Sequence, residues 1–267
     1  MRINWFAPLS LVQNTSNLLS LSLLQKLGQE NQIIWWVNQS GNRSSEYLLN
    51  LDQNTQIKFY ELDNIAWPEV HQGDINIYNI GNDPERYQNI WMVAQQCPGI
   101  IILQDLNYQA FFTRIYQEND NKKGYLEQMR YYYGVDTIKI AEQFWQGEIP
   151  LLLMAENYPL IPLVVKNALG VVSHHQPTYL DLKEKNQWLT CYIASPYQDL
   201  NLYADSLLDF AHYVCRFRCQ GTMAYFIERV AWEMGVWSQN LSFCLEQQKL
   251  TQAILFLSSP NNLNNFC

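Results

Sequence analysis

An amide and a carboxylate follow directly on a short run that is almost wholly apolar. Gln104 and Asp105 come immediately after Gly99-Ile100-Ile101-Ile102-Leu103. A continuous apolar run bounded by turn residues is typical of a strand buried on both faces, as in parallel sheets. Ligands of such sheets bind just beyond the carboxyl ends of the strands. We therefore expect a ligand site at Gln104 and Asp105, if the protein has one.

The two side chains differ in the chemistry that they allow. The Asp105 carboxylate could accept hydrogen bonds from ligand hydroxyl groups, or it could serve as the N-cap of a helix starting at Leu106. The Gln104 amide could bond a hydroxyl group but cannot take or give a proton near neutral pH. No catalytic residue is therefore predicted, and both interpretations of Asp105 stay open.

Other polar residues are candidates for ligand contacts from neighbouring loops. Asn14, Thr15 and Asn82 could contact a ligand, although such residues more often satisfy turns and helix caps. His174 follows a predicted strand and could bind a ligand, the alternative being a solvent-facing loop. His212, Cys215 and Cys219 share a helical face and could hold Zn²⁺ with a fourth ligand. We favour buried cysteines there and expect no metal.

The motifs of common catalytic and cofactor sites are missing from the sequence. No Gly-x-Gly-x-x-Gly follows the first predicted strand, so we expect no nucleotide cofactor. We also find no Gly-x-Ser-x-Gly or His-Glu-x-x-His. An aromatic set could line a cleft, but we expect at least half of it in the core: Phe111, Phe112, Tyr116, Tyr131, Tyr132 and Tyr133.

The elements that must position these residues alternate between strand and helix. About six strands are predicted within 2–7, 32–38, 55–60, 74–79, 99–104, 169–173 and 189–194, with 55–60 as a possible exposed one. Helical patterns fill the intervals, above all 107–167. This order predicts an α/β fold with a Rossmann-like, doubly wound, mainly parallel sheet. After residue 197 the chain reads as all helix, with helical faces at 204–215, 223–234 and 250–257.

Composition and charge limit the partners of the protein. The net charge is −8, and the longest Lys/Arg cluster is Lys122-Lys123, which argues against nucleic acid. The six cysteines form no Cys-x-x-Cys pair, and no signal peptide is recognised, so a reduced cytoplasmic protein is expected. No apolar run reaches the length needed to span a bilayer.

Several segments resemble the N-terminal half of family 4 glycosyltransferases, retaining enzymes of the GT-B type, in their bacterial and cyanobacterial branch. The resemblance covers about residues 1–197, and its order and spacing match over that range. The segments that carry it are Asn4-Trp5-Phe6-Ala7-Pro8-Leu9, Ile75-Asn76-Ile77-Tyr78-Asn79-Ile80-Gly81-Asn82, Pro98 through Asp105, Gly124-Tyr125-Leu126, Tyr131-Tyr132-Tyr133-Gly134, Tyr158-Pro159-Leu160 and Asn167-Ala168-Leu169-Gly170-Val171.

This resemblance implies an acceptor-side domain at 1–197 and a helical tail at 198–267 that packs back on it. The family's donor-binding half, with its Glu, seven residues, Glu signature, is expected to be absent. The acceptor side also departs from the family. Gln104 stands where a His is usual, Tyr87-Gln88 replaces another, and Ser10 through Asn14 replaces a loop rich in Pro and Gly.

Three functions remain open from the sequence. The first is a glycosyltransferase-like pseudoenzyme that binds a sugar or glycan acceptor, or a partner, without transferring sugar alone. The second is the acceptor half of a split enzyme whose donor half is a separate chain. The third is an assembly subunit, such as a homo-oligomer, in which surplus Trp and Tyr cover an interface. The isolated chain is expected to be inactive in each case.

Overall fold

The computed structural model describes residues 1–9, 15–38, 53–185 and 189–233. The chain divides into two compact units, Met1–Ala211 and His212–Cys267. This division falls inside the last helix, whereas the sequence predicts a boundary at residue 197. The first unit carries the sheet and all residues of the candidate site.

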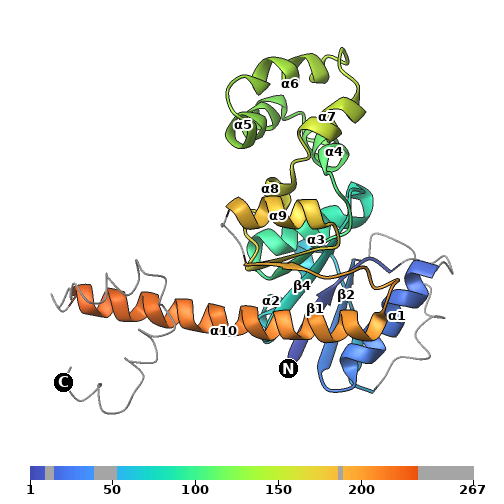
Figure 1. Cartoon of the computed structure of the whole chain (residues 1–267), viewed down its shortest axis with the longest axis vertical. Helices are drawn as coiled ribbons and strands as arrows, with labels where there is room; N and C mark the ends of the chain where they lie inside the picture. Colours follow the sequence, from blue (N-terminus) through green and yellow to red (C-terminus); the bar gives the residue numbers. More distant parts are fainter. Residues whose placement is uncertain (10–14, 39–52, 186–188, 234–267) are drawn as a thin grey trace. The chain divides into compact units, whose positions relative to one another are not determined.

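The first unit is an α/β domain built on one parallel sheet, as the alternating pattern predicts (Figure 1). Within the described residues the sheet has seven strands, one at each of the predicted ranges, including the possible strand at 55–60. The strands are β1 (Arg2–Phe6), β2 (Gln32–Asn38), β3 (Thr55–Tyr60), β4 (Ile75–Ile80), β5 (Ile100–Leu103), β6 (Gly170–Ser173) and β7 (Leu189–Tyr192).

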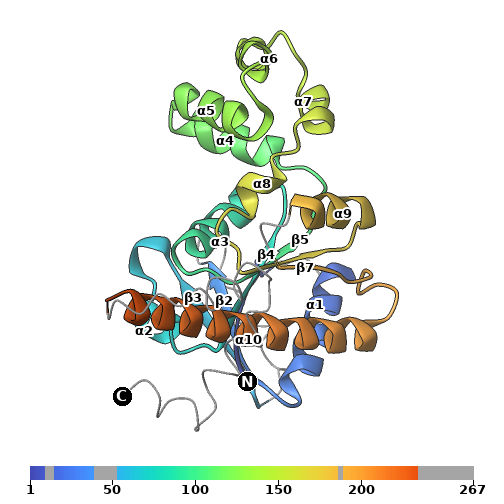
Figure 2. The ribbon, with the colours of Figure 1, turned by 60° about the vertical axis from the view of Figure 1, so that its left-hand side comes forward.

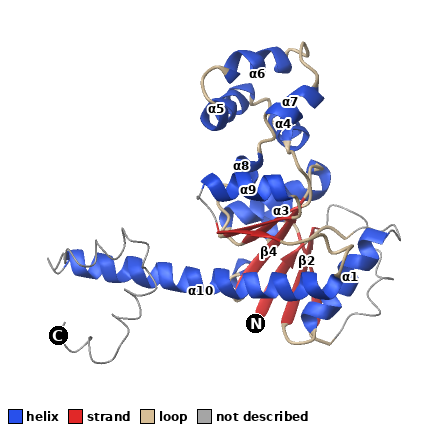
Figure 3. Cartoon of the chain, viewed as in Figure 1, coloured by secondary structure: helices blue, strands red, loops and turns tan. Residues whose placement is uncertain are grey.

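The strands lie in the order β3-β2-β1-β4-β5-β6-β7, and every neighbouring pair is parallel. The chain therefore steps outward from β1 in one direction and then returns to β4 on its other side. This Rossmann-like order places the reversal between β1 and β4. Figure 3 shows the strands as a single red layer among blue helices.

Helices fill the connections between strands, because a parallel crossover needs a long return path. In chain order they are α1 (Thr15–Gly28), the 3-10 turn η2 (Leu62–Asn64), α2 (Trp67–Val70), α3 (Pro84–Gln96), α4 (Gln109–Glu118), α5 (Lys122–Tyr133), α6 (Thr137–Trp145), α7 (Leu151–Asn157), α8 (Ile161–Val164), α9 (Gln176–Lys185) and α10 (Leu200–Glu233).

The core follows from the alternation of side chains along buried strands. All four residues of β5 are buried, so this strand is covered on both faces. Alternate strand residues such as Phe6, Trp36 and Tyr78 join one large hydrophobic cluster with α3 and the helices after β5. Ile3, Trp5 and Trp35 are buried too, and their side chains point to the opposite face.

Four helices between β5 and β6 form a helical unit, which we define as α4 to α7. Figures 1 and 2 show this unit beyond the carboxyl ends of the strands rather than against a face of the sheet. Its buried residues are mostly apolar and include the fully buried Phe111, Phe112 and Met129, with Gln109 and Thr113 among the buried polar ones. The predicted helical stretch 107–167 is therefore confirmed, with breaks at or near the glycines and prolines.

The last helix differs from the expectation. The sequence predicts separate helices at 204–215 and 223–234, but α10 is continuous from Leu200 to Glu233. Gly221 lies inside it, and an interior glycine costs only about 1 kcal/mol, too little to end a long helix. Tyr203, Ala204 and Leu207 are buried within the first unit. The third predicted helix, 250–257, lies outside the described residues.

Across the described helices, none combines the length and the apolar character that crossing a membrane requires.

Candidate functional site

The candidate residues gather at the carboxyl edge of four adjacent strands. Thr15 follows β1, Asn82 follows β4, Gln104 and Asp105 follow β5, and His174 follows β6. Because the strands are parallel and adjacent, these positions all lie at one edge of the sheet. The strongest candidates follow β4 and β5, next to the reversal between β1 and β4.

Asp105 connects the loop after β5 to the loop after β4. Its Oδ2 accepts a hydrogen bond of 2.6 Å from the main-chain N–H of Asn82. The short distance is typical of a charge-assisted bond to a carboxylate. The carboxylate is nevertheless exposed to solvent. Asp105 is thus fixed in position while its carboxylate stays open to a ligand.

The proposed role of Asp105 as a helix N-cap is wrong. No helix begins at Leu106, because α4 begins at Gln109 with Tyr108 at its N-cap position, and Tyr108 makes no side-chain cap bond. The α4 terminus is instead satisfied from another loop. Asn82 Oδ1 accepts from the main-chain N–H of Phe111 at 3.0 Å.

Asn82 therefore uses its main-chain N–H and both polar atoms of its side chain inside the protein. Besides its main-chain bond to Asp105 and its cap on α4, its Nδ2 donates to Asn107 Oδ1 at 3.2 Å. These three bonds hold residues 105 to 111 against the end of β4. A ligand contact by Asn82 stays a prediction, but its observed partners give it a structural role.

Gln104 and Asn79 form an amide pair beside Asp105. The Gln104 main-chain N–H donates to the Ile80 carbonyl at 3.0 Å, and its Nε2 donates to Asn79 Oδ1 at 3.0 Å. Asn79 Nδ2 is buried and has no hydrogen-bond partner. Gln104 is exposed, so this edge of the sheet offers amide groups together with a carboxylate.

Two tyrosines complete the site, and neither was a predicted site residue. A Cβ added at Gly81 would lie 2.7 Å from the Tyr87 ring and 3.1 Å from Asp105 Oδ2, so the ring and the carboxylate both approach this glycine closely. Burial raises the pKa of Tyr87, Arg86 opposes that, and Asp105 adds to it. Tyr108, in the loop between β5 and α4, is fully buried. The signal available in the sequence was Gly81, which leaves room for the Tyr87 ring.

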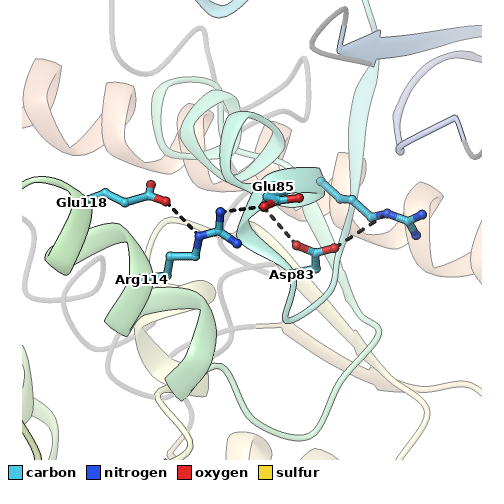
Figure 4. A network of polar contacts seen from close by, with 5 residues as sticks. Asp83, Glu85, Arg114 and Glu118 are labelled. Atoms are coloured by element: carbon cyan, nitrogen blue, oxygen red, sulfur yellow. Dashed lines mark hydrogen bonds and ion pairs between the residues drawn. The ribbon is translucent and has the colours of Figure 1, made fainter. Parts of the chain in front are cut away.

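A chain of exposed ion pairs runs beside the site, from α3 to α4 (Figure 4). Arg114 bonds Glu85 at 2.6 Å and Glu118 at 2.8 Å. Asp83 accepts from the Glu85 main-chain N–H at 3.1 Å and lies 3.7 Å from Arg86. Both arginines near the site are therefore already paired with carboxylates.

His174 is held in a different set of contacts. Its Nδ1 donates to the Ile193 carbonyl at 2.9 Å, and its ring lies 5.5 Å from the ring of Tyr203 on α10. Burial lowers the pKa of His174, and the bond to Ile193 opposes that shift. The sequence-based alternative of a solvent-facing loop does not describe this half-buried side chain.

Ligand contacts by Asn14 and Thr15 stay predictions. Asn14 lies outside the described residues, and Thr15 begins α1 with its side chain outside the described set. The alternative of a zinc site at His212, Cys215 and Cys219 stays untested, because the Cys219 side chain lies outside the described set. In the described part of the chain, no group of three or more His, Cys, Asp or Glu residues could hold a metal ion.

The aromatic set belongs mostly to the core. Phe111 and Phe112 are fully buried, while Tyr116, Tyr132 and Tyr133 pack against the same cluster. Tyr131 is the exception, with 78% of its surface exposed. The expectation that at least half of the set is core is therefore confirmed.

The fold and the site define an α/β protein of Rossmann-like topology with a polar edge at the ends of β4 and β5. Comparison with protein-family models gives no match to this chain, and comparison with curated proteins gives none either.

Proposed function

We propose that this chain is a glycosyltransferase-like binding protein that does not transfer sugar on its own. The observation that carries the proposal is the exposed Asp105 carboxylate, held at 2.6 Å by the Asn82 N–H at the carboxyl edge of the sheet. The resemblance to the acceptor side of family 4 enzymes names the ligand class, a sugar or glycan. In this proposal the scattered cysteines favour the cytoplasm.

The chemistry of the edge suits a ligand with several hydroxyl groups. A carboxylate accepts hydrogen bonds from hydroxyls, while the Gln104 amide can both donate and accept. Fixed polar groups of this kind orient a ligand without the entropic cost of ordering themselves on binding. The bond from Asn82 to Asp105 supplies that preorganisation.

The same edge is poorly equipped for sugar transfer. The two side chains after β5 are an exposed carboxylate and an amide, and the amide cannot carry a proton. Transfer from a nucleotide sugar also needs fixed positive groups against the phosphates. The nearby arginines, Arg86 and Arg114, are engaged with Asp83, Glu85 and Glu118. These facts favour a binding role over catalysis.

The test has a catalytic arm and a binding arm. The pure chain is incubated with UDP-glucose, UDP-N-acetylglucosamine and GDP-mannose, and released nucleotide is measured. The expected result is no release above the buffer rate. N-Acetylglucosamine, glucose and mannose are then titrated while the main-chain amide signals of Asn82 and Asp105 are followed by NMR.

Binding by at least one sugar should saturate and should weaken in Asp105→Ala. Asp181→Ala is the matched control, because Asp181 is an exposed aspartate on α9 that pairs with Lys185. Turnover of a nucleotide sugar by the isolated chain, lost in Asp105→Ala, would contradict the proposal. Turnover only after adding a separate donor-half protein would favour the split enzyme instead.

A further inference from the structure

We infer that Tyr108 is a positioning residue that fixes the Asp105 loop and joins it to the segment leaving the helical unit. The inference rests on the proposed function only in taking the Asp105 edge as the site. Tyr108 lies between β5 and α4 and is fully buried. Its side chain and its main chain bond to two different parts of the protein.

The side-chain hydroxyl bridges the ends of two adjacent strands. It donates to the Ile80 carbonyl at the end of β4 over 2.8 Å. The main-chain N–H of Asp105, after β5, donates to the same hydroxyl over 3.4 Å. Burial raises the pKa of Tyr108 far above its ordinary value. The hydroxyl therefore keeps its proton and can donate the hydrogen bond to the Ile80 carbonyl.

The main chain of Tyr108 holds the outgoing segment of the helical unit. Its N–H donates to the Pro159 carbonyl at 2.7 Å. The next residue strengthens this link, because Gln109 Nε2 donates to the Tyr158 carbonyl. The segments that enter and leave the helical unit are thus tied together at Tyr108.

The outgoing segment is also strained. Leu160 has a φ of 54°, a left-handed conformation that is costly for a leucine, and its N–H donates to the Tyr133 hydroxyl at 2.7 Å. A strained residue persists only where the surrounding contacts hold it. Tyr108 is therefore one of the contacts that connect this segment to the Asp105 edge.

The hydroxyl, rather than the ring, carries the inference. The ring packs edge-on against Phe111, with centroids 6.3 Å apart, and a phenylalanine would make the same contact. Tyr108→Phe therefore removes the bridge between the strand ends and leaves the packing. The effect on the Asp105 loop can then be separated from any effect on the core.

Hydrogen exchange of single main-chain amides tests the inference without a ligand. In Tyr108→Phe the amides of Asp105 and Asn82 should exchange about 5- to 10-fold faster, as expected for the loss of one hydrogen bond. The amide of Ile102 inside β5 should keep its rate relative to the other core amides. In a sugar titration, Tyr108→Phe should weaken binding by a similar factor.

Tyr78→Phe is the matched control. Tyr78 is a fully buried tyrosine on β4 whose hydroxyl also donates to a main-chain carbonyl, that of Cys97 ahead of β5. It should leave the amides of Asp105 and Asn82 unchanged. Unchanged exchange at Asp105 and Asn82 in Tyr108→Phe, or equal acceleration in both variants, would overturn the inference. Absence of sugar binding in the wild type would reject the proposed function while the exchange result still decides the role of Tyr108.

Discussion

Asn4 and Asn76 face each other on β1 and β4 and join their side-chain amides inside the core. Asn4 Nδ2 donates to Asn76 Oδ1 at 2.8 Å and to the Val70 carbonyl at 2.7 Å. Asn4 Oδ1 accepts from Trp36 Nε1 at 3.0 Å. The two residues are direct partners in the parallel register. This buried polar contact pins β1 against β4, the strands that flank the reversal of the sheet.

Removing the Asn4 amide should destabilise the protein strongly. Asn4→Ala leaves Trp36 Nε1 and Asn76 Oδ1 without this partner, and each buried unsatisfied group costs about 1–3 kcal/mol, whereas the Val70 carbonyl still accepts from the Gly73 N–H. We expect the free energy of unfolding to fall by at least about 2 kcal/mol, measured by urea denaturation. Gln56→Ala, an exposed amide on β3, should change it by less than about 0.5 kcal/mol. Similar losses in both variants would contradict the role of Asn4.

A methyl group at Gly99 should be costly for a different reason. A Cβ there would lie 2.2 Å from the main-chain oxygen of Asn76, and a main-chain atom of the sheet cannot move aside cheaply. Gly99→Ala should lower the free energy of unfolding by at least about 2 kcal/mol, in the range of overpacked cores. Gly134→Ala separates a clash from main-chain strain, because Gly134 has a φ of 94° but open space at Cβ. That variant should lose stability through main-chain strain alone, by about 1–3 kcal/mol. An unchanged free energy of unfolding in Gly99→Ala would reject the clash.

Much of the sheet could be predicted because a strand that is buried on both faces consists of a short, continuous run of apolar residues. The run Ile100–Leu103 is buried on both faces. Its wholly apolar composition predicts this burial even when the neighbouring elements are unknown. The continuous helix α10 was missed because Gly221 and two arginines, Arg216 and Arg218, lie between the two predicted helical faces, although one glycine does not end a long helix. Local propensity is too weak to decide such a case.

Gln104 and Asp105 lie at the carboxyl edge of the sheet, as the sequence predicts, but the hydrogen bonds around them could not be predicted. Two polar residues after a buried strand are enough to place Gln104 and Asp105 at the sheet edge. The cap that Asn82 provides to Phe111 joins residues 29 positions apart and depends on how two loops meet. The same holds for Tyr108, whose hydroxyl reaches β4 from the loop after β5. Such contacts are set by tertiary packing and leave no local pattern.

Acidification should weaken the fold through His174. The pKa of His174 is lowered from its ordinary value of 6.5 by burial, so the folded protein holds fewer protons than the unfolded chain at and below that pH. The free energy of unfolding therefore falls as the pH drops through about 6.5, with a slope of at most about 1.4 kcal/mol per pH unit for one group. Above this window the contribution is fully present.

Urea denaturation of the wild type and His174→Gln at pH 7.5, 6.5 and 5.5 measures this contribution. The wild type should lose stability more steeply than the variant on acidification, because the variant has no imidazole to protonate. His71→Gln, at a solvent-exposed position, should follow the wild type. Parallel curves for the wild type and His174→Gln would show that the pKa of His174 is the same in the folded and unfolded states, which would contradict the prediction.

The cap that Asn82 places on α4 can be tested directly at Phe111. Asn82→Ala removes the acceptor for the Phe111 N–H, and loss of a helix N-cap costs about 1–2 kcal/mol. We expect that loss in urea denaturation, together with faster hydrogen exchange of the Phe111 amide. Asn82→Asp keeps an acceptor oxygen and should retain most of the protection at Phe111. Asn119→Ala is the control, because Asn119 is an exposed residue that bonds the Ile115 carbonyl at the other end of α4. Since that bond is remote from the first turn, Asn119→Ala should leave Phe111 exchange unchanged, and equal acceleration in Asn82→Ala and Asn119→Ala would mean that Asn82 does not cap the helix.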